Sequence, residues 1–307
     1  MTHLHAREGD TKIFLTKALC ALLATVAVTF SAACAGDAAA PVQNPELNVI
    51  SVGRDFGIGK NRLPLAILRL DMTSVNDRAQ DLVVTYQHST GGSAKRLDDV
   101  KWRVWPVRNG VYVGYPEFDR AGAWEFTVTF NEGGRKLSGS AFVEVKEKTS
   151  SPAVGAAAPA SETKVAFSAA ELLQITSSVN PIPSLYGMNL SSAIKSGRPT
   201  VVTFSTPAFC TTQTCGPQLE VINNLRLAYG NSVNFLHVEI YDNPREMLEK
   251  GDVSIGRVFR AVKEWGLVSE PWTFLIGSDG NIFARFEAFT TQDELESAVV
   301  AMLAGIW

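Results

Sequence analysis

The stretch TVVTFSTPAFCTTQTCGP, residues 200–217, decides the fold of the C-terminal half of the chain. Its first five residues form a mainly apolar run of the kind found in a buried strand of a parallel sheet. A helical pattern follows the stretch, so Cys210 and Cys215 lie between a strand and a helix. Because a helix N-terminus favours the thiolate form of cysteine, this pair is a candidate redox centre.

The composition limits the classes of function that need to be considered. A chain of 307 residues is long enough for two domains with additional segments, and 46% hydrophobic residues suffice for sizeable cores. The formal net charge is only −3, and no stripe of lysine and arginine runs along the chain. Nucleic acid is therefore not an expected partner. Two of the four cysteines precede residue 36, so the folded part contains one dithiol.

Residues 1–36 have the pattern of a secretory signal, with lysines, an apolar stretch over 18–30 and then small residues. Cys34 lies in a segment that resembles the lipidation site of bacterial lipoproteins, although Ser31 occupies the place where leucine is usual. Ordinary cleavage after Ala35 and retention as a signal anchor are the alternatives. Each outcome places the rest of the chain outside the cytoplasm, where disulfides persist. The product is then either a lipoprotein or anchored protein of the cell membrane, or a secreted or periplasmic one.

Residues 46–147 contain short alternating runs separated by turn residues, which predicts a β-sandwich. The piece DRAGAWEF, residues 119–126, resembles the late strand pair of immunoglobulin-like modules in exported bacterial proteins. A fold of this type does not by itself indicate a function. The expected strands are 65–70, 82–86, 101–105, 111–115, 124–130 and 141–145.

Residues 148–184 are expected to form a linker with one short helix. Alanine, proline and serine dominate its first part, which cannot bury a core of its own and should be flexible. Ser168 and Glu171 have the spacing of a capping box, so a helix should begin there.

Residues 185–307 are expected to form a second domain with the element order α-β-α-β-α-β-β-α. Leu219, Ile222, Leu225 and Tyr229 lie on one face of the helix that follows the dithiol. The expected strands are 200–204 and 233–241 and the hairpin 273–286, and the other helices are 191–196, 255–265 and one that begins after Thr291.

This element order, with a dithiol after the first strand, resembles the thioredoxin-like superfamily. Asp242-Asn243-Pro244 and Glu270-Pro271-Trp272-Thr273 are similar to the corresponding segments of that family. The resemblance implies a multidomain chain in which an all-β immunoglobulin-like sandwich precedes an α/β thioredoxin-like domain. It also implies that Pro271 is cis and faces the thiols.

The spacing of the two cysteines departs from the thioredoxin pattern, because four residues separate them instead of two. In a continuous helix the Cα atoms of residues i and i+5 are about 8.6 Å apart. A disulfide needs less than about 7 Å. We therefore expect Cys210 to lie in the loop and the helix to begin near Thr212 or Thr214, either of which can cap it.

The expected chemistry is extracytoplasmic thiol–disulfide exchange with protein thiols and disulfides as partners and no cofactor. Cys210 precedes the helix and should be the more exposed thiol, so it is the expected nucleophile, and Cys215 is expected to resolve the mixed disulfide. By the resemblance, Pro271, Glu270 and Trp272 form the substrate groove.

The position of the buried acid of thioredoxins is occupied by Thr203 in this chain. His237 is then the alternative proton acceptor, since its reference pKa suits that role. A packed histidine without a role in catalysis is the other interpretation.

Three other functions remain open at this point, and with them the question whether the chain is an enzyme. The pair can be a structural bond, although so short a loop constrains the unfolded chain little. The same thiols can carry Cu(I), which soft thiolates select, although only His88 and His237 follow the signal segment. The chain can also be a binding module built on a thioredoxin scaffold.

Overall fold

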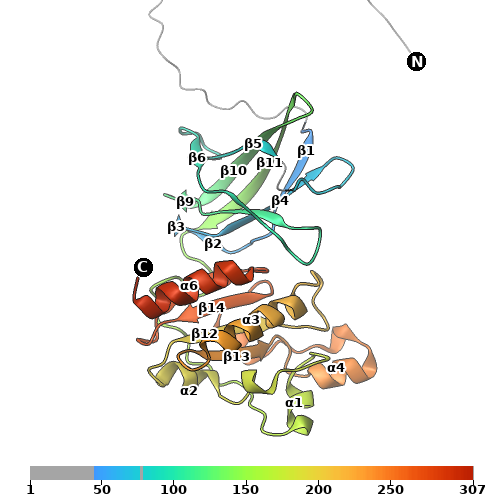
Figure 1. The fold of residues 1–307 in the computed structure, drawn as a ribbon, viewed down its shortest axis with the longest axis vertical. Helices are drawn as coiled ribbons and strands as arrows, with labels where there is room; N and C mark the ends of the chain where they lie inside the picture. The colour runs from blue at the N-terminus through green and yellow to red at the C-terminus, as the bar shows by residue number, and fades with distance from the viewer. Residues whose placement is uncertain (1–44, 77–78, 307) are drawn as a thin grey trace, which may run out of the picture. The chain divides into compact units, whose positions relative to one another are not determined.

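The computed structural model describes residues 45–76 and 79–306 of the chain (Figure 1). No helix within these ranges is both long enough and apolar enough to cross a membrane. The expected signal segment, with Cys34, lies outside the described residues.

The N-terminal part folds as a sandwich of two sheets. One sheet has the strand order β1-β4-β8-β7, the other has the order β2-β11-β10-β5-β6, and β3 and β9 form a separate short pair. All six strands expected from alternation are present with shifted ends, whereas β1 and four strands of two or three residues were not expected. The strands are β1 (Leu47–Ser51), β2 (Phe56–Gly57), β3 (Gly59–Lys60), β4 (Leu63–Arg69), β5 (Gln80–His88), β6 (Lys95–Leu97), β7 (Lys101–Arg103), β8 (Val111–Gly114), β9 (Glu117–Phe118), β10 (Gly122–Glu132) and β11 (Arg135–Lys146).

Alternation along β10 builds the core of the sandwich. Trp124, Phe126, Val128 and Phe130 lie on one face of the strand and are buried, because successive side chains of a strand point to opposite faces. They pack against residues of the other sheet such as Ile67. Burying each such side chain contributes about 1.5–3 kcal/mol.

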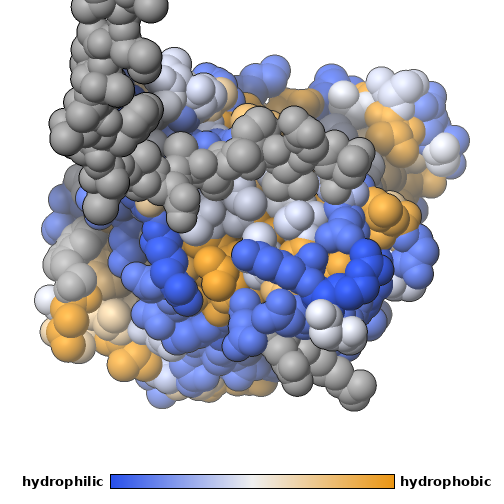
Figure 2. All heavy atoms as spheres, turned by 90° about the horizontal axis from the view of Figure 1, so that it is seen from above, coloured by the Kyte–Doolittle hydropathy of each residue, from blue (hydrophilic) through white to orange (hydrophobic). Residues whose placement is uncertain are grey.

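The molecular face drawn in Figure 2 is mostly hydrophilic, with apolar side chains in small separate groups.

The C-terminal part is built on a central sheet with the strand order β13-β12-β14-β15. β12 and β13 are parallel, while β14 is antiparallel to both β12 and β15. The elements are α1 (Ala169–Ile175), η1 (Pro183–Leu185), α2 (Leu190–Lys195), β12 (Thr200–Ser205), α3 (Cys215–Tyr229), β13 (Asn234–Glu239), α4 (Pro244–Lys250), η2 (Val253–Ile255), α5 (Arg260–Glu264), β14 (Trp272–Ile276), β15 (Ile282–Glu287) and α6 (Gln292–Ala304).

Helices cover both faces of this sheet, because its strands are apolar on both sides (Figure 1). Val201 and Leu275 pack with residues of α3 and α6, such as Ile222. Their neighbours Val202 and Phe274 point the other way and pack with residues of α2 and α5. This sheet order, covered by helices on both faces, is the thioredoxin-like fold.

The expected helix over residues 255–265 is shorter than its apolar spacing indicated. Gly256 has an extended backbone, with φ −60° and ψ 126°, and separates η2 from α5. A further helix, α4, begins with Pro244, which suits a first helical turn because proline lacks the N–H that would stay unpaired there.

The segment that was expected to be a flexible linker is held against the thioredoxin-like domain by backbone hydrogen bonds. The amide of Gly155 donates to Ile282 O, Ile282 N donates to Ala156 O, and Ala158 N donates to Gly280 O, so the segment pairs with the β14–β15 hairpin. Ala158 is buried in the core between sheet and helices. Composition rightly indicates that such a segment has no core of its own, but it can still contribute to a neighbouring one.

The sandwich and the thioredoxin-like domain belong to one compact unit and share a buried contact. Arg62 Nε, from the sandwich, donates to Glu294 Oε1 of α6 at 2.7 Å, and both side chains are 4% exposed. Trp105 packs edge-on against Phe289, with ring centroids 5.7 Å apart. Asp55 accepts hydrogen bonds from the amides of Ser150 and Ser151, which joins the sandwich to the connecting segment.

Candidate functional site

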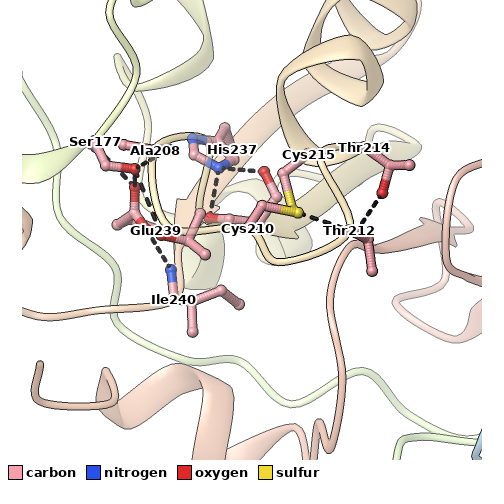
Figure 3. The surroundings of a disulfide bond; sticks show 11 residues. Ser177, Ala208, Cys210, Thr212, Thr214, Cys215, His237, Glu239 and Ile240 are labelled. Atoms are coloured by element: carbon pink, nitrogen blue, oxygen red, sulfur yellow. Dashed lines mark hydrogen bonds between the residues drawn. A yellow bond between two sulfur atoms is a disulfide. The ribbon is translucent and has the colours of Figure 1, made fainter. Parts of the chain in front are cut away.

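Cys210 lies in the loop that joins β12 to α3, and it forms a disulfide with Cys215 at the start of α3 (Figure 3). Their Cα atoms are 6.0 Å apart, within the range that a disulfide requires. The loop achieves this with a turn in which Gln213 N donates to Cys210 O and Gln213 has a positive φ of 58°. The predicted geometry, with Cys210 outside the helix, is confirmed.

The two sulfur-bearing residues differ in exposure. Cys215 is the first residue of α3 and is fully buried, whereas Cys210 is only partly buried. Cys210 Sγ lies 3.2 Å from Thr212 Oγ1, and that hydroxyl is 2.8 Å from Thr214 Oγ1. Thr214 is at the N-cap position, but its hydroxyl does not cap the helix. Attack from outside therefore reaches Cys210 first.

A buried acid, Glu239, lies at the end of β13 next to the strand that leads into the dithiol. The register places it beside Ser205, and the residue is 5% exposed. Its Oε2 accepts from both the amide and the hydroxyl of Ser177 at 2.8 Å, and its Oε1 accepts from Ile240 N. Burial raises the pKa of Glu239, against the effect of these hydrogen bonds.

Ser177 connects this acid to the disulfide loop. Its hydroxyl accepts a hydrogen bond from Ala208 N at 3.1 Å, two residues before Cys210 (Figure 3). Neither Glu239 nor Ser177 was among the expected site residues. An acidic residue at the end of an otherwise apolar strand was the signal available for Glu239, whereas nothing in the sequence placed Ser177 beneath the loop.

His237 does not have the environment expected of a proton acceptor. The ring is buried, and both of its nitrogens have hydrogen-bond partners. Nδ1 lies 2.7 Å from the Tyr186 hydroxyl, and Nε2 lies 2.9 Å from Ser205 Oγ and 3.1 Å from Ser205 O. Burial lowers the pKa of His237 to about 4, so the ring is neutral at pH 7 and a poor base. The structure therefore agrees with the packed histidine.

Pro271 is in the cis form, as the resemblance implied. It precedes β14, whose residue Trp272 pairs with Phe204 near the end of β12, so Pro271 lies at the end of the sheet from which the dithiol loop begins. Glu270 is half-buried, and burial raises its pKa while Arg54 opposes the shift. The charge of Glu270 also acts on Tyr241.

Tyr241 packs against the disulfide loop. Its ring centroid is 5.9 Å from that of Phe209, the neighbour of Cys210, in an edge-on contact.

Trp272 does not line a groove, contrary to the expectation. It is 1% exposed and stacks on Phe274 with ring centroids 5.3 Å apart. Its Nε1 donates to Ser269 Oγ, and Arg285 lies over the ring. The side chain points into the core because its position in β14 alternates with that of Thr273, which faces Thr203.

The described residues contain no group of three or more histidine, cysteine, aspartate or glutamate side chains that could hold a metal ion. Within the same ranges His88 belongs to the sandwich, where its ring nitrogens bond Thr90 and Ala121.

The arrangement is suited to disulfide exchange. An external thiolate can attack Cys210 Sγ, and Cys215 is then the leaving group at the first turn of a 15-residue helix. The free N–H groups and the dipole of that turn stabilise a thiolate.

Comparison with known proteins gives matches only among solved structures. No family model and no curated protein matches the chain. A putative thiol:disulfide interchange protein DsbE from Chlorobium tepidum is 17% identical, with 50% of this chain and 99% of that chain covered and a TM-score of 0.34. A thiol-disulfide oxidoreductase from Bacteroides fragilis NCTC 9343 is 18% identical, with 42% and 98% covered and a TM-score of 0.26. The Lin-41 filamin domain is 11% identical, with 34% and 94% covered and a TM-score of 0.21.

Proposed function

We propose that the chain catalyses thiol–disulfide exchange on protein substrates through Cys210 and Cys215. The observation that carries the proposal is the disulfide at the start of α3, with one partly exposed and one buried sulfur. A bond that only stabilised the fold would gain little from so short a loop, because closing few residues restricts the unfolded chain only slightly.

In the oxidised form, a substrate thiolate attacks Cys210 Sγ, the bond to Cys215 breaks, and Cys215 leaves as a thiolate. A second substrate thiolate then attacks the substrate sulfur of the mixed disulfide and releases Cys210. The substrate loses two electrons and two protons and gains a disulfide, while the protein gains a dithiol. The reverse sequence reduces a substrate disulfide, and the reduction potential decides the direction.

Two structural features support roles for the residues around the sulfurs. Glu239 holds the loop through Ser177 and Ala208, and Glu270 and Pro271 directly precede β14 at the end of the sheet where the loop begins. We assign Glu239 to positioning the loop and Pro271 to shaping the substrate edge, where an extended peptide can pair.

The proposal includes the place where the protein works. A pair of cysteines placed to form a disulfide suits an oxidising compartment, and the signal pattern of residues 1–36 agrees with export. We propose that the protein is a lipoprotein attached to the membrane through Cys34. An immunoglobulin-like sandwich at 46–147 and a thioredoxin-like domain at 185–307 follow this residue. The wild type should incorporate a labelled fatty acid and Cys34→Ala should not. Incorporation by Cys34→Ala at the level of the wild type would exclude lipidation at this residue.

Trapping of the mixed disulfide tests the exchange reaction. The full chain is incubated with a reduced, unfolded protein that has a single thiol, so that no second substrate thiol can release the adduct, and the products are separated on non-reducing gels. Cys215→Ser, first oxidised at Cys210 by an activated aromatic disulfide, should accumulate a covalent adduct, whereas Cys210→Ser treated identically should form little because its remaining sulfur is buried. Equal adducts in both variants would refute the assigned order of attack. No exchange by the wild type, together with stoichiometric Cu(I) retention, would favour the carrier function instead.

A further inference from the structure

A cleft of about 690 Å³ lies between the sandwich and the disulfide loop. One wall comes from the first sheet of the sandwich and the turn before β8, and the other comes from Thr211–Thr214. The sandwich side is mostly apolar and is lined by residues that include Ile50, Leu68, Met72, Trp105 and Val107.

The cleft is adjacent to the reactive sulfur. Thr212 is one of its lining residues, and Thr212 Oγ1 is 3.2 Å from Cys210 Sγ. A polypeptide whose sulfur reacts with Cys210 would therefore place the residues next to that sulfur in or beside the cleft.

The two walls are held in place by buried contacts. Trp105 and Val111 pack with Ala288 and Phe289 of the thioredoxin-like domain in one apolar cluster. The cleft is therefore preformed in the oxidised protein, and an occupant does not need to bring the two domains together.

Two features of the lining indicate what the occupant provides. Arg108 is the only charged side chain among the lining residues, it is exposed, and no ion pair is found for it within the described ranges. The other side chains on the sandwich wall are mostly apolar. Apolar side chains of a peptide therefore complement this wall, and an acidic side chain complements Arg108.

We propose that this cleft binds an extended segment of the substrate polypeptide, in which apolar side chains flank the reacting cysteine and one acidic side chain reaches Arg108. The inference rests on the proposed exchange function and names its substrate class. It also gives the sandwich a role, because that domain supplies the apolar wall beside the disulfide.

Three peptides, each with two cysteines at the same spacing, test the proposal. The first carries leucine and glutamate beside the cysteines, the second replaces leucine by serine, and the third replaces glutamate by lysine. Each is mixed with the oxidised full chain, and the rate at which the Cys210–Cys215 disulfide is reduced is followed by acid quench and thiol alkylation. Each rate is divided by the rate at which dithiothreitol reduces the same variant. This ratio corrects for any change in the intrinsic reactivity of the disulfide.

The leucine–glutamate peptide should react about tenfold faster than the serine peptide, which is the effect of burying one apolar side chain. Combining Ile50→Gln with Met72→Gln should remove this preference, and Arg108→Glu should invert the preference for glutamate over lysine. Ile50 and Met72 are 45% and 49% exposed, so these changes do not disturb the core. The matched control is Phe142→Gln, an exposed residue outside the cleft, which should retain the preference.

Equal relative rates for the three peptides on the wild type would overturn the cleft proposal and leave the exchange function standing. Reduction by dithiothreitol without reaction with any peptide or model protein would overturn the exchange function, and the cleft proposal with it.

Discussion

The buried ion pair between Arg62 and Glu294 predicts a large loss of stability when only one partner is removed. Arg62 Nε and Nη2 donate to the two carboxylate oxygens at 2.7 and 2.9 Å. Nη1 and Nη2 also donate to Glu287 O and Phe289 O at 2.8 and 3.1 Å. Arg62→Met retains the apolar stem and removes all four hydrogen bonds.

After this change Glu294 keeps the hydroxyl of Tyr115, at 2.6 Å, as its remaining side-chain donor. Breaking a buried pair by removing one partner typically costs about 3–5 kcal/mol, because the other charge stays buried without compensation. We expect the free energy of unfolding of Arg62→Met to fall by that amount. Arg62→Met combined with Glu294→Leu should cost less than Arg62→Met alone, because the unpaired charge is gone.

Urea unfolding of the full chain, followed by tryptophan fluorescence, measures these differences. Arg69→Met is the matched control, since the Arg69–Glu132 pair is 34% and 43% exposed. Such a surface pair contributes about 0–1 kcal/mol. Either of two results would refute a buried, compensated pair: Arg62→Met costs no more than Arg69→Met, or the double variant costs as much as Arg62→Met alone.

Two further predictions concern buried titratable groups. Because burial lowers the pKa of His237 from 6.5 to about 4, its contribution to stability is present above pH 6.5 and is lost as the pH falls toward 4. Urea titrations of His237→Gln should show a flatter dependence over this window, and a slope equal to that of the wild type would contradict the assignment. Because burial raises the pKa of Glu239, its contribution is complete at low pH and is lost as the pH rises through the raised value. The free energy of unfolding of Glu239→Gln, relative to the wild type, should therefore rise as the pH increases above 4.5, and a constant difference would argue against a buried acid.

Features with a local cause could be predicted from the sequence. The spacing of Cys210 and Cys215 excluded a continuous helix between them, and the loop geometry follows that reasoning. Alternation predicted β10 and β11 because one face of each strand is buried. The cis form of Pro271 came from the family resemblance and not from the residues themselves.

Features that depend on distant partners could not be predicted in the same way. Ser177 reaches Glu239 across 62 positions, and Arg62 reaches Glu294 across 232, so no local pattern indicates either pair. Trp272 was assigned to a groove from its place after Pro271, but the packing of Phe274 and Arg285 around it decides that it is buried. The predicted capping box at Ser168 is confirmed, since both of its hydrogen bonds form within four residues.

The pairing of residues 155–158 with the hairpin determines how the protein can be divided. A fragment that begins at Leu185 would lack Ala158 and Ala166, each of which fills part of the core on one face of the sheet. It would also lack Ser177, the partner of Glu239. Excision at the compositional boundary would therefore expose hydrophobic surface and remove the two donors that Ser177 supplies to Glu239 Oε2. The shortest autonomous version of the C-terminal domain has to begin upstream of Gly155.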